Sequence, residues 1–235
     1  MSSVRERLEM PEYLLHAEEL HKSYSLTPAL TDASFSISAG EVVAIMGPSG
    51  SGKSTLLHCL AGIVPPDSGE VLYRGQDLTK MNDAERSALR RNEFGFVFQF
   101  GQLVPELNCW ENVALPLRLN GVRQSEARAQ ATEWLARLDI EDLAQMRPGE
   151  ISGGQGQRVA VARALAVRPG VIFADEPTGA LDSANGRRVM DLFTEAARDS
   201  RVAVVLVTHD PAVATYADHE IEVKDGRTYS RELQA

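Results

Sequence analysis

The stretch Gly47-Pro48-Ser49-Gly50-Ser51-Gly52-Lys53-Ser54 decides the fold of this chain. It follows the apolar run Val42–Met46, which predicts a strand covered on both faces, and it leads into residues 54–61, which predict a helix ending at Gly62. This strand, loop and helix match the pattern G-x-x-x-x-G-K-[ST] in the structural context that the pattern requires. The sequence therefore predicts a phosphate-binding loop on a largely parallel α/β sheet.

The residue types in this loop suit a nucleoside triphosphate. Glycines let backbone N–H groups turn inward around an anion, and the amino terminus of the following helix adds a favourable dipole. Lys53 can neutralise charge on the β- and γ-phosphates, and the Ser54 hydroxyl can bind Mg²⁺. A strand-to-helix turn shaped by glycine geometry alone is the alternative, and the complete strand, loop and helix argue against it. The expected nucleotide-binding residues here are Gly47, Pro48, Ser49, Gly50, Ser51, Gly52, Lys53, Ser54 and Thr55.

A second apolar strand, predicted at residues 171–174, ends in the carboxylates Asp175 and Glu176. An Asp at this place completes the Mg²⁺ shell of phosphate-loop enzymes, commonly through water. A carboxylate one residue further on can orient or deprotonate the attacking water. Strands often end in solvated acids, so this pattern gains its meaning from the phosphate loop. Together the two motifs indicate hydrolysis of a nucleoside triphosphate.

The rest of the chain continues the α/β pattern, with a mainly helical insertion in the middle. A turn is predicted at residues 65–69, where prolines and a glycine gather. Further strands are predicted at residues 14–20, 33–37, 71–73, 94–98 and 202–208. Helices are predicted at residues 106–119, 123–138, 155–167 and 184–197.

Composition bounds the class of protein. The 235 residues carry a formal net charge of -9, which argues against a protein whose main task is to grip nucleic acid phosphates. Two cysteines, Cys59 and Cys109, cannot form a disulfide framework. The longest apolar run, residues 202–207, falls far short of the ~20 residues of a membrane helix. Residues 1–12 are charged, and we expect neither a membrane span nor a secretion signal.

The residues Ile151-Ser152-Gly153-Gly154-Gln155 open the helix predicted at 155–167. A serine and glycine N–H groups at a helix amino terminus form a second anion site, although Ser-Gly-Gly could also be a simple helix cap. This segment resembles the signature of the ATP-binding subunits of ATP-binding-cassette (ABC) transporters. Ile151 in place of the usual Leu and Gly156 in place of Gln or Glu depart from the family pattern. The resemblance implies that Ser152, Gly153, Gly154 and Gln155 close over ATP held by a second copy of the chain, in a head-to-tail dimer.

Four further residues match the family in order. The resemblance implies that Tyr24 stacks on adenine and that Gln99 senses Mg²⁺ at the start of the helical insertion. Asp182 matches the loop that crosses the dimer interface, and it also suits the amino-terminal cap of the next helix. His209, directly after the strand predicted at 202–208, resembles the histidine that contacts the γ-phosphate. Glu176, His209 and Lys53 are therefore the expected catalytic residues, and Ser54, Gln99 and Asp175 are the expected Mg²⁺ ligands.

The resemblance also implies an architecture. It consists of a P-loop NTPase core with a mainly parallel sheet, an antiparallel β subdomain near the amino terminus and an inserted α-helical subdomain. The expected divisions are an amino-terminal tail at 1–12, an ATPase domain at 13–228 and a carboxy-terminal tail at 229–235. Within the ATPase domain, residues 13–98 and 155–228 form the core and β subdomain, and about 99–154 form the helical subdomain. This helical part holds the signature and the groove for a coupling helix of a permease, and residues 101–117 are expected to hold much of that groove.

Finer similarity points to one branch of the family. Residues 94–99, 111–117 and 175–183 resemble the macrolide-exporter and lipoprotein-release group, whose members pair with a separate integral-membrane permease. The resemblance implies an ATPase with ATP and Mg²⁺ as cofactors, at the cytoplasmic face of the inner membrane. It would power efflux or extraction of a drug, peptide, haem or lipoprotein, and the sequence does not choose among these substrates.

Two other classes fit less well. A soluble ABC ATPase acting on DNA or ribosomes tends to carry coiled coils, zinc modules or fused cassettes, and the sequence shows none of these. A P-loop kinase or GTPase has no use for the Ser152-Gly153-Gly154-Gln155 signature. The sequence also lacks the Asn-Lys-x-Asp stretch that reads guanine.

Overall fold

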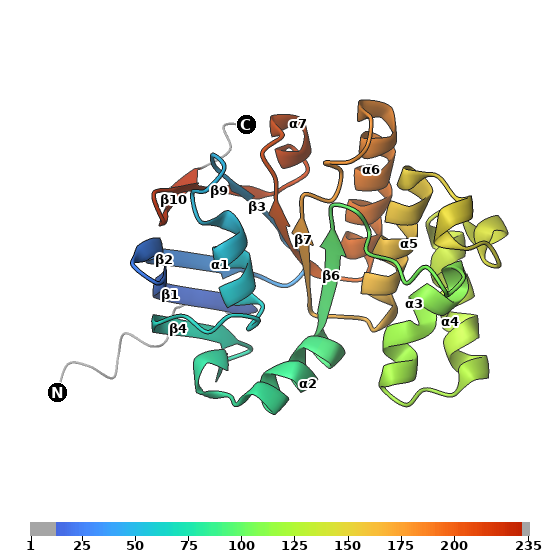
Figure 1. Cartoon of the computed structure of the whole chain (residues 1–235), viewed down its shortest axis with the longest axis horizontal. Helices are drawn as coiled ribbons and strands as arrows, with labels where there is room; N and C mark the ends of the chain where they lie inside the picture. Colours follow the sequence, from blue (N-terminus) through green and yellow to red (C-terminus); the bar gives the residue numbers. More distant parts are fainter. Residues whose placement is uncertain (1–12, 232–235) are drawn as a thin grey trace.

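The computed structural model describes residues 13–231, so the expected tail at 1–12 and residues 232–235 lie outside the described part. Across residues 13–231, six strands form one sheet in the order β10-β9-β3-β8-β7-β6 (Figure 1). Its strands pair in parallel except at β10, which is antiparallel to β9. The strands are β3 (Val42–Met46), β6 (Phe94–Phe98), β7 (Val171–Asp175), β8 (Ala203–Val207), β9 (His219–Lys224) and β10 (Arg227–Arg231).

A second, antiparallel sheet lies beside helix α1 (Lys53–Leu60), with strand order β2-β1-β4-β5 (Figure 1). Its strands are β1 (Leu15–Tyr24), β2 (Thr27–Ile37), β4 (Ser68–Tyr73) and β5 (Gln76–Asp77). The predicted fold class is therefore confirmed, with a parallel-dominated core and an antiparallel part near the amino terminus.

Along the chain, the remaining helices come between strands of the large sheet (Figure 1). Three of them separate β6 from β7, as the mainly helical insertion predicts. The helices are α2 (Asp83–Glu93), α3 (Cys109–Leu119), α4 (Gln124–Arg137), α5 (Gly153–Ala166), α6 (Ser183–Asp199) and α7 (Pro211–Ala214), with short 3₁₀ turns η2 (Leu78–Lys80), η3 (Glu141–Leu143) and η4 (Pro148–Glu150). In the described range 13–231, none of these helices has the length and apolar character needed to cross a membrane.

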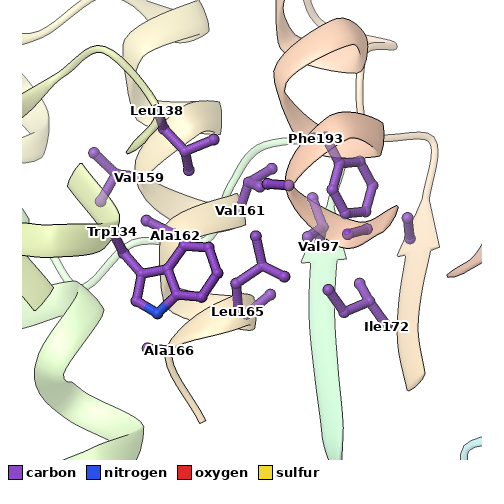
Figure 2. Packing of buried hydrophobic residues seen from close by; sticks show 14 of the residues in the cluster. Val97, Trp134, Leu138, Val159, Val161, Ala162, Leu165, Ala166, Ile172 and Phe193 are labelled. Atoms are coloured by element: carbon purple, nitrogen blue, oxygen red, sulfur yellow. The ribbon is translucent and has the colours of Figure 1, made fainter. Parts of the chain in front are cut away.

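The large sheet separates two hydrophobic cores, because successive side chains of a strand point to opposite faces. Val42 and Ala44 of β3 belong to the core that also contains α5, whereas Val43 and Ile45 belong to the core that contains α1. Figure 2 shows the first core, in which α5 packs between the strands and helix α4. The residues drawn there include Val97, Ile172, Val161, Leu165, Trp134 and Phe193. Helices α1 and α5 therefore cover opposite faces of one sheet.

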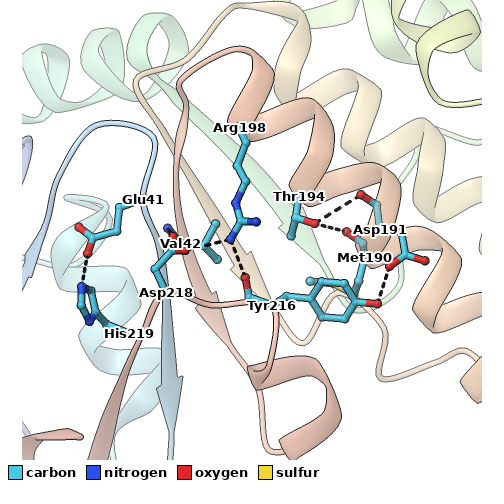
Figure 3. A network of polar contacts seen from close by, with 9 residues as sticks. All are labelled: Glu41, Val42, Met190, Asp191, Thr194, Arg198, Tyr216, Asp218 and His219. Atoms are coloured by element: carbon cyan, nitrogen blue, oxygen red, sulfur yellow. Dashed lines mark hydrogen bonds and ion pairs between the residues drawn. The ribbon is translucent and has the colours of Figure 1, made fainter. Parts of the chain in front are cut away.

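A polar network joins α6 to the strand-start edge of the sheet (Figure 3). Arg198 donates to Asp218 Oδ1 over 2.9 Å, and Asp218 Oδ2 accepts the backbone N–H of Val42 over 2.9 Å. At the same edge, His219 Nε2 lies 2.8 Å from Glu41 Oε1. These contacts lie at the edge opposite to the phosphate loop, because Val42 begins β3 and the loop follows its end.

Two predicted helix starts are wrong by a few residues, and capping explains both. Helix α3 begins at Cys109 instead of residue 106, because Asn108 and Glu111 form a capping box there. Helix α5 begins at Gly153 instead of residue 155, because Ser152 is its N-cap. Both signature glycines therefore lie in the first turn of α5.

Helix α2 and the hairpin β9–β10 have no counterpart among the predicted elements. Helix α2 has no fully buried residue, and Leu89, which packs partly buried against the core, is its one large apolar side chain. Its sequence therefore gives only a weak apolar period. The hairpin alternates polar and apolar residues and turns at Asp225-Gly226, which is a typical hairpin signal. Strand β10 runs to Arg231, so the expected domain end at residue 228 falls inside a strand.

Candidate active site

Four segments with candidate catalytic residues follow four neighbouring strands of the large sheet. The phosphate loop (residues 47–54) follows β3, His209 follows β8, Asp175 and Glu176 end β7, and Gln99 follows β6. The parallel register aligns these ends, because Asp175 is paired with Phe98 on one side and with Val207 on the other. Ligands of open α/β sheets bind at the carboxyl ends of the strands, where all four segments meet.

The shape of the phosphate loop requires glycine at two positions. Gly47 has φ +144°, and a Cβ there would lie 2.2 Å from the carbonyl oxygen of Val223. Gly52 has φ +110°, and a Cβ there would lie 2.4 Å from the carbonyl oxygen of Ala29. Both positions combine a left-handed backbone with an approach that no side chain allows.

The hairpin turn between β9 and β10 is hydrogen-bonded to the phosphate loop. The N–H of Gly226 donates to the carbonyl of Ser51 over 3.0 Å, and the N–H of Thr31 donates to the carbonyl of Gly226 over 2.8 Å. The loop is thereby held between β2 and the hairpin. Sequence reasoning missed this support, and the Asp225-Gly226 turn is the signal that could have revealed it.

Lys53 and the start of α1 provide groups that suit an anion. The Lys53 ammonium donates to the carbonyls of Gly47 and Pro48, each over 2.9 Å. Helix α1 has Gly52 as its N-cap and no side-chain cap, so its first-turn N–H groups are available to an anion. A phosphate oxygen is a stronger acceptor for Lys53 than these neutral carbonyls.

Asp175 and Ser54 provide hard oxygen ligands beside this cradle. Burial raises the pKa of Asp175, although a hydrogen bond with Ser54 and the positive charge of Lys53 oppose the rise. A carboxylate that is costly to bury as an anion becomes favourable beside a cation. A carboxylate, a hydroxyl and the amide of Gln99 are a donor set that suits Mg²⁺ together with nucleotide phosphates. Within residues 13–231, no cluster of three or more His, Cys, Asp or Glu side chains is placed to hold a metal by itself.

Glu176 stands in a strained backbone conformation with φ +50°, which is uncommon for a residue other than glycine. Its N–H donates to the carbonyl of Val207 over 2.9 Å, and its carbonyl accepts the N–H of Gly179 over 3.0 Å. Its Oε1 lies 2.7 Å from Nδ1 of His209. This conformation turns the carboxylate toward the end of β8.

Gln99 approaches the same carboxylate over the turn at Gly179. A Cβ on Gly179 would lie 2.9 Å from Nε2 of Gln99 and 3.2 Å from Oε2 of Glu176. The two side chains therefore share a narrow space that only a glycine leaves open. The structure brings Gln99, Asp175, Glu176 and His209 together with Lys53 and Ser54.

The signature segment (residues 152–155) and Asp182 form a second group. Ser152 Oγ accepts the N–H of Gln155 over 3.3 Å, and Gln155 Oε1 accepts the N–H of Ser152 over 2.8 Å. Asp182 caps α6 by accepting the N–H groups of Ala184 and Asn185, and these bonds lower the pKa of Asp182.

Asn185 connects these two parts of the second group. It donates from Nδ2 to Asp182 Oδ2 over 2.6 Å, and its side chain lies against Gly154. The signature segment begins α5, which covers the sheet face opposite to α1. The phosphate loop and the signature segment therefore begin helices that cover opposite faces of the sheet.

Tyr24 stands apart from both groups, at the end of β1 in the antiparallel sheet. Half of its surface is exposed, at 50%, and Lys22 Nζ lies 6.0 Å from its ring centre. Lys22 in turn pairs with Asp67 over 2.8 Å. An exposed ring of this kind is free to stack on a planar ligand.

The phosphate loop follows the parallel strand β3, and a histidine, two acids and an amide lie at the ends of the neighbouring strands β8, β7 and β6. This combination defines a P-loop nucleoside triphosphatase. Comparison with known proteins identifies the group within this class. The family model described as ABC transporter matches residues 30–179. The chain belongs to this family, and it is an ABC-type ATPase.

Solved structures of ABC cassettes agree in sequence and shape. The ATP-binding cassette MJ0796, in a dimeric post-hydrolysis state bound to ADP and Pi, is 38% identical with a TM-score of 0.84, covering 94% of this chain and 99% of that chain. A dimeric structure of MJ0796 as a bacterial ABC transporter cassette is 39% identical, with a TM-score of 0.84 and coverages of 94% and 99%. The cbiO1 protein from Clostridium perfringens, part of the ABC transporter complex cbiONQ, is 32% identical with a TM-score of 0.85, covering 93% of this chain and 88% of that chain.

Proposed function

We propose that this chain is the motor subunit of an ABC transporter or mechanotransmission complex, working as a head-to-tail dimer on a membrane permease. One observation carries the proposal. The phosphate loop starts α1 and the signature segment starts α5, and these helices cover opposite faces of the sheet. A second copy supplies the signature that each phosphate loop needs. The dimeric MJ0796 structures support a dimer.

In this proposal the residues of one copy divide the chemistry of ATP hydrolysis. Lys53 and the N–H groups of the phosphate loop bind the β- and γ-phosphates, and Tyr24 stacks on the base. Mg²⁺ bound among Ser54, Gln99 and Asp175 would neutralise phosphate charge. Glu176 orients and polarises the attacking water. His209 donates from Nδ1 to Glu176. Contact with the γ-phosphate needs the doubly protonated ring, in which Nε2 donates as well.

The second copy completes the site with its signature segment. The Ser152 oxygen accepts the helix-capping hydrogen bond, so its O–H proton remains available to a phosphate oxygen. The N–H groups of Gly153 and Gly154 lie in the first turn of α5, where the helix dipole favours an anion. Asp182, held beside the signature by Asn185, lies where the two copies would meet.

The permease would bind in a groove beside the Gln99 segment, at the cytoplasmic face of the inner membrane. The groove has a volume of about 510 Å³ and is lined by β6 aromatic rings, by residues of α2, α3 and α5, and by arginines. Of the expected 101–117 segment, Leu115 and Pro116 line it. Its main lining residues are Phe94, Phe96, Phe98, Leu115, Pro116, Leu119, Arg90, Arg91 and Arg163. A short amphipathic helix suits a groove of this kind.

The cbiO1 protein, which is 32% identical to this chain, is part of the ABC transporter complex cbiONQ. This similarity supports a permease partner. Resemblance to the macrolide-exporter and lipoprotein-release branch favours efflux or extraction of a drug, peptide, haem or lipoprotein. The permease sets which substrate is moved.

Replacing Glu176 with Gln tests the proposal. The variant should bind ATP normally, lose hydrolysis by about 10²–10⁴-fold, and elute as a dimer in size-exclusion chromatography with Mg²⁺ and ATP but as a monomer without nucleotide. Glu195→Gln, an exposed position on α6, is the matched control and should behave as wild type. Full turnover by Glu176→Gln, or a variant that binds ATP and remains monomeric, would contradict the proposal.

A further inference from the structure

Arg163 of α5 makes an unusual pair of contacts for a partly buried cation. Its two terminal nitrogens donate to the backbone carbonyls of Gly101, over 2.7 Å, and Gln102, over 2.8 Å. Among residues 13–231 no carboxylate forms an ion pair with it, and burial lowers its pKa. A buried charge with carbonyl partners alone is costly, so these two hydrogen bonds matter for its placement.

The segment that Arg163 holds is the Gln99 loop (residues 98–102). Both of its acceptor residues have left-handed backbones, with φ +66° at Gly101 and +45° at Gln102. Such a conformation costs about 1–3 kcal/mol at a residue other than glycine and persists where surrounding contacts enforce it. Arg163 supplies two of those contacts.

A second side chain of α5 holds the other end of the loop. Gln157, which is 3% exposed, donates from Nε2 to the carbonyl of Phe98 over 2.9 Å. Within the loop itself, Phe100 is 77% exposed and gives little anchorage. The position of the Gln99 side chain beside Glu176 therefore depends on α5 at both ends of the loop.

Arg163 also lines the groove proposed above for the permease. The residue that holds the Gln99 loop is therefore also one of the residues that line the groove. An acidic group entering the groove would compete with the two carbonyls for this cation, because a carboxylate is the stronger acceptor.

We propose that Arg163 is a positioning residue that holds the Gln99 loop, and with it the Gln99 side chain, in place for Mg²⁺. This inference rests on the proposed Mg²⁺ role of Gln99, and it is testable on the isolated full-length chain.

The first test is a Mg²⁺ titration of ATP hydrolysis with Arg163→Met and Arg163→Lys. The Mg²⁺ concentration for half-maximal activity should rise several-fold in Arg163→Met and less in Arg163→Lys, while ATP binding measured without Mg²⁺ stays unchanged. Arg158→Met is the matched control: Arg158 lies on the same helix and also donates to two carbonyls, those of Leu138 and Asp139, away from the loop. An unchanged Mg²⁺ dependence in Arg163→Met would overturn the proposal.

A double-mutant cycle with Gln99→Ala separates this inference from the function on which it rests. The Mg²⁺ effects of Arg163→Met and Gln99→Ala should not add, because both act through one side chain. Fully additive effects would overturn the positioning role of Arg163. A wild-type Mg²⁺ dependence in Gln99→Ala would instead remove the proposed role of Gln99.

Hydrogen exchange gives a readout that does not depend on turnover. The N–H groups of Gly101 and Gln102 are bonded within the loop, to the carbonyls of Phe98 and Phe100. Their exchange should speed up in Arg163→Met, and in Arg163→Lys if the methionine variant does not fold, but not in Arg158→Met. Wild-type protection of the loop in a folded Arg163 variant would overturn the proposal.

Discussion

Nδ1 of His209 lies 2.7 Å from Oε1 of Glu176, and the two residues follow the adjacent strands β8 and β7. The carboxylate is mostly buried, with 24% of the side chain exposed, whereas the imidazole is 68% exposed. A buried acid is thus oriented by a ring that remains open to a ligand. A second His–Glu pair, His219 with Glu41 at 2.8 Å and similar exposures of 62% and 19%, occurs at the opposite edge of the sheet (Figure 3).

The comparison of the His209–Glu176 contact with the His219–Glu41 contact gives the first prediction. His209→Ala should lower the ATPase rate by about 10²-fold, and His209→Gln by less, because the amide retains a donor for Glu176. ATP affinity should stay within a few-fold in both, and steady-state kinetics with a nucleotide-binding assay will measure this. His219→Ala is the control, because it removes an equivalent contact away from the site. Equal rates in His209→Ala and wild type would contradict the role of His209.

Glycine substitutions in the phosphate loop should separate backbone strain from steric overlap. Gly52→Ala and Gly47→Ala should each cost about 3 kcal/mol or more of unfolding free energy, because the new Cβ meets a backbone carbonyl. Gly50→Ala should cost about 1–2 kcal/mol, because Gly50 has φ +78° but no atom within 4 Å of the place that a Cβ would take. Urea denaturation will measure all three, and equal costs would show that the contacts with Val223 and Ala29 are not tight.

Asp175→Asn should stabilise the nucleotide-free protein while removing activity. Burial raises the pKa of Asp175 in the folded state above its ordinary value of 3.8. Ionisation of Asp175 therefore destabilises the folded protein progressively as the pH rises from 3.8 to the pKa of the folded state, and the full loss is present above that pKa. The variant should therefore melt higher than wild type near neutral pH, with a gain that shrinks as the pH falls.

Asp182→Asn is the contrasting control. The pKa of Asp182 is lowered by its capping hydrogen bonds, so its charge contributes stability above 3.8 that is lost as the pH falls through the folded value. This variant should melt lower than wild type near neutral pH. Thermal melts at several pH values will measure both, and a shift of the same sign in the two variants would contradict the burial argument.

Gly156→Ala should stabilise the chain. Gly156 lies inside α5, and a Cβ there would make ordinary contacts at 3.9 Å with Ile151 and Leu103. Alanine should add about 0.5–1 kcal/mol to the free energy of unfolding, through helix propensity and a less flexible unfolded chain. Gly154→Ala is the comparison: its Cβ would lie 3.4 Å from Asn185, so it should gain less. Chemical denaturation will measure both, and a loss of stability in Gly156→Ala would contradict the prediction.

The sequence predicts most of the large sheet because its central strands are apolar runs that hydrophobicity alone detects. Val42–Met46 and Ala203–Val207 are apolar runs buried on both faces, and each is followed by a residue of the site. The parallel arrangement then places the strand ends together without any knowledge of side-chain contacts. Motif order adds the roles expected of Gln99 and Asp182, which remain proposals.

Polar surface elements escape this kind of prediction. Helix α2 has no fully buried residue and one large apolar side chain, Leu89, which packs partly buried against the core. Hydrophobic periodicity is therefore weak, and the clearer local signal is the capping box of Asn82 with Glu85. The alternation and Asp225-Gly226 turn of β9–β10 were a stronger signal, and this hairpin supports the phosphate loop. Attention to capping and turn residues would have found both.

Contacts between distant segments lie beyond sequence patterns altogether. Helical spacing tells which face of α5 is buried, but not that Arg163 reaches the carbonyls of Gly101 and Gln102. The pattern G-x-x-x-x-G-K-[ST] requires Gly52, but not that Ala29 is the residue it touches. Such contacts depend on how the helices and sheets pack against one another. The residue types of a local stretch do not predict that packing.

The placement of the phosphate loop and the signature segment on opposite faces has a kinetic consequence. In the proposed dimer, the free chain meets its partner by diffusion, so hydrolysis per molecule should rise with protein concentration and become second order overall in dilute solution. A permease that holds two copies side by side replaces this encounter with a fixed effective concentration. The permease would then raise the rate of ATP hydrolysis by holding the two copies together, independently of any substrate that it moves.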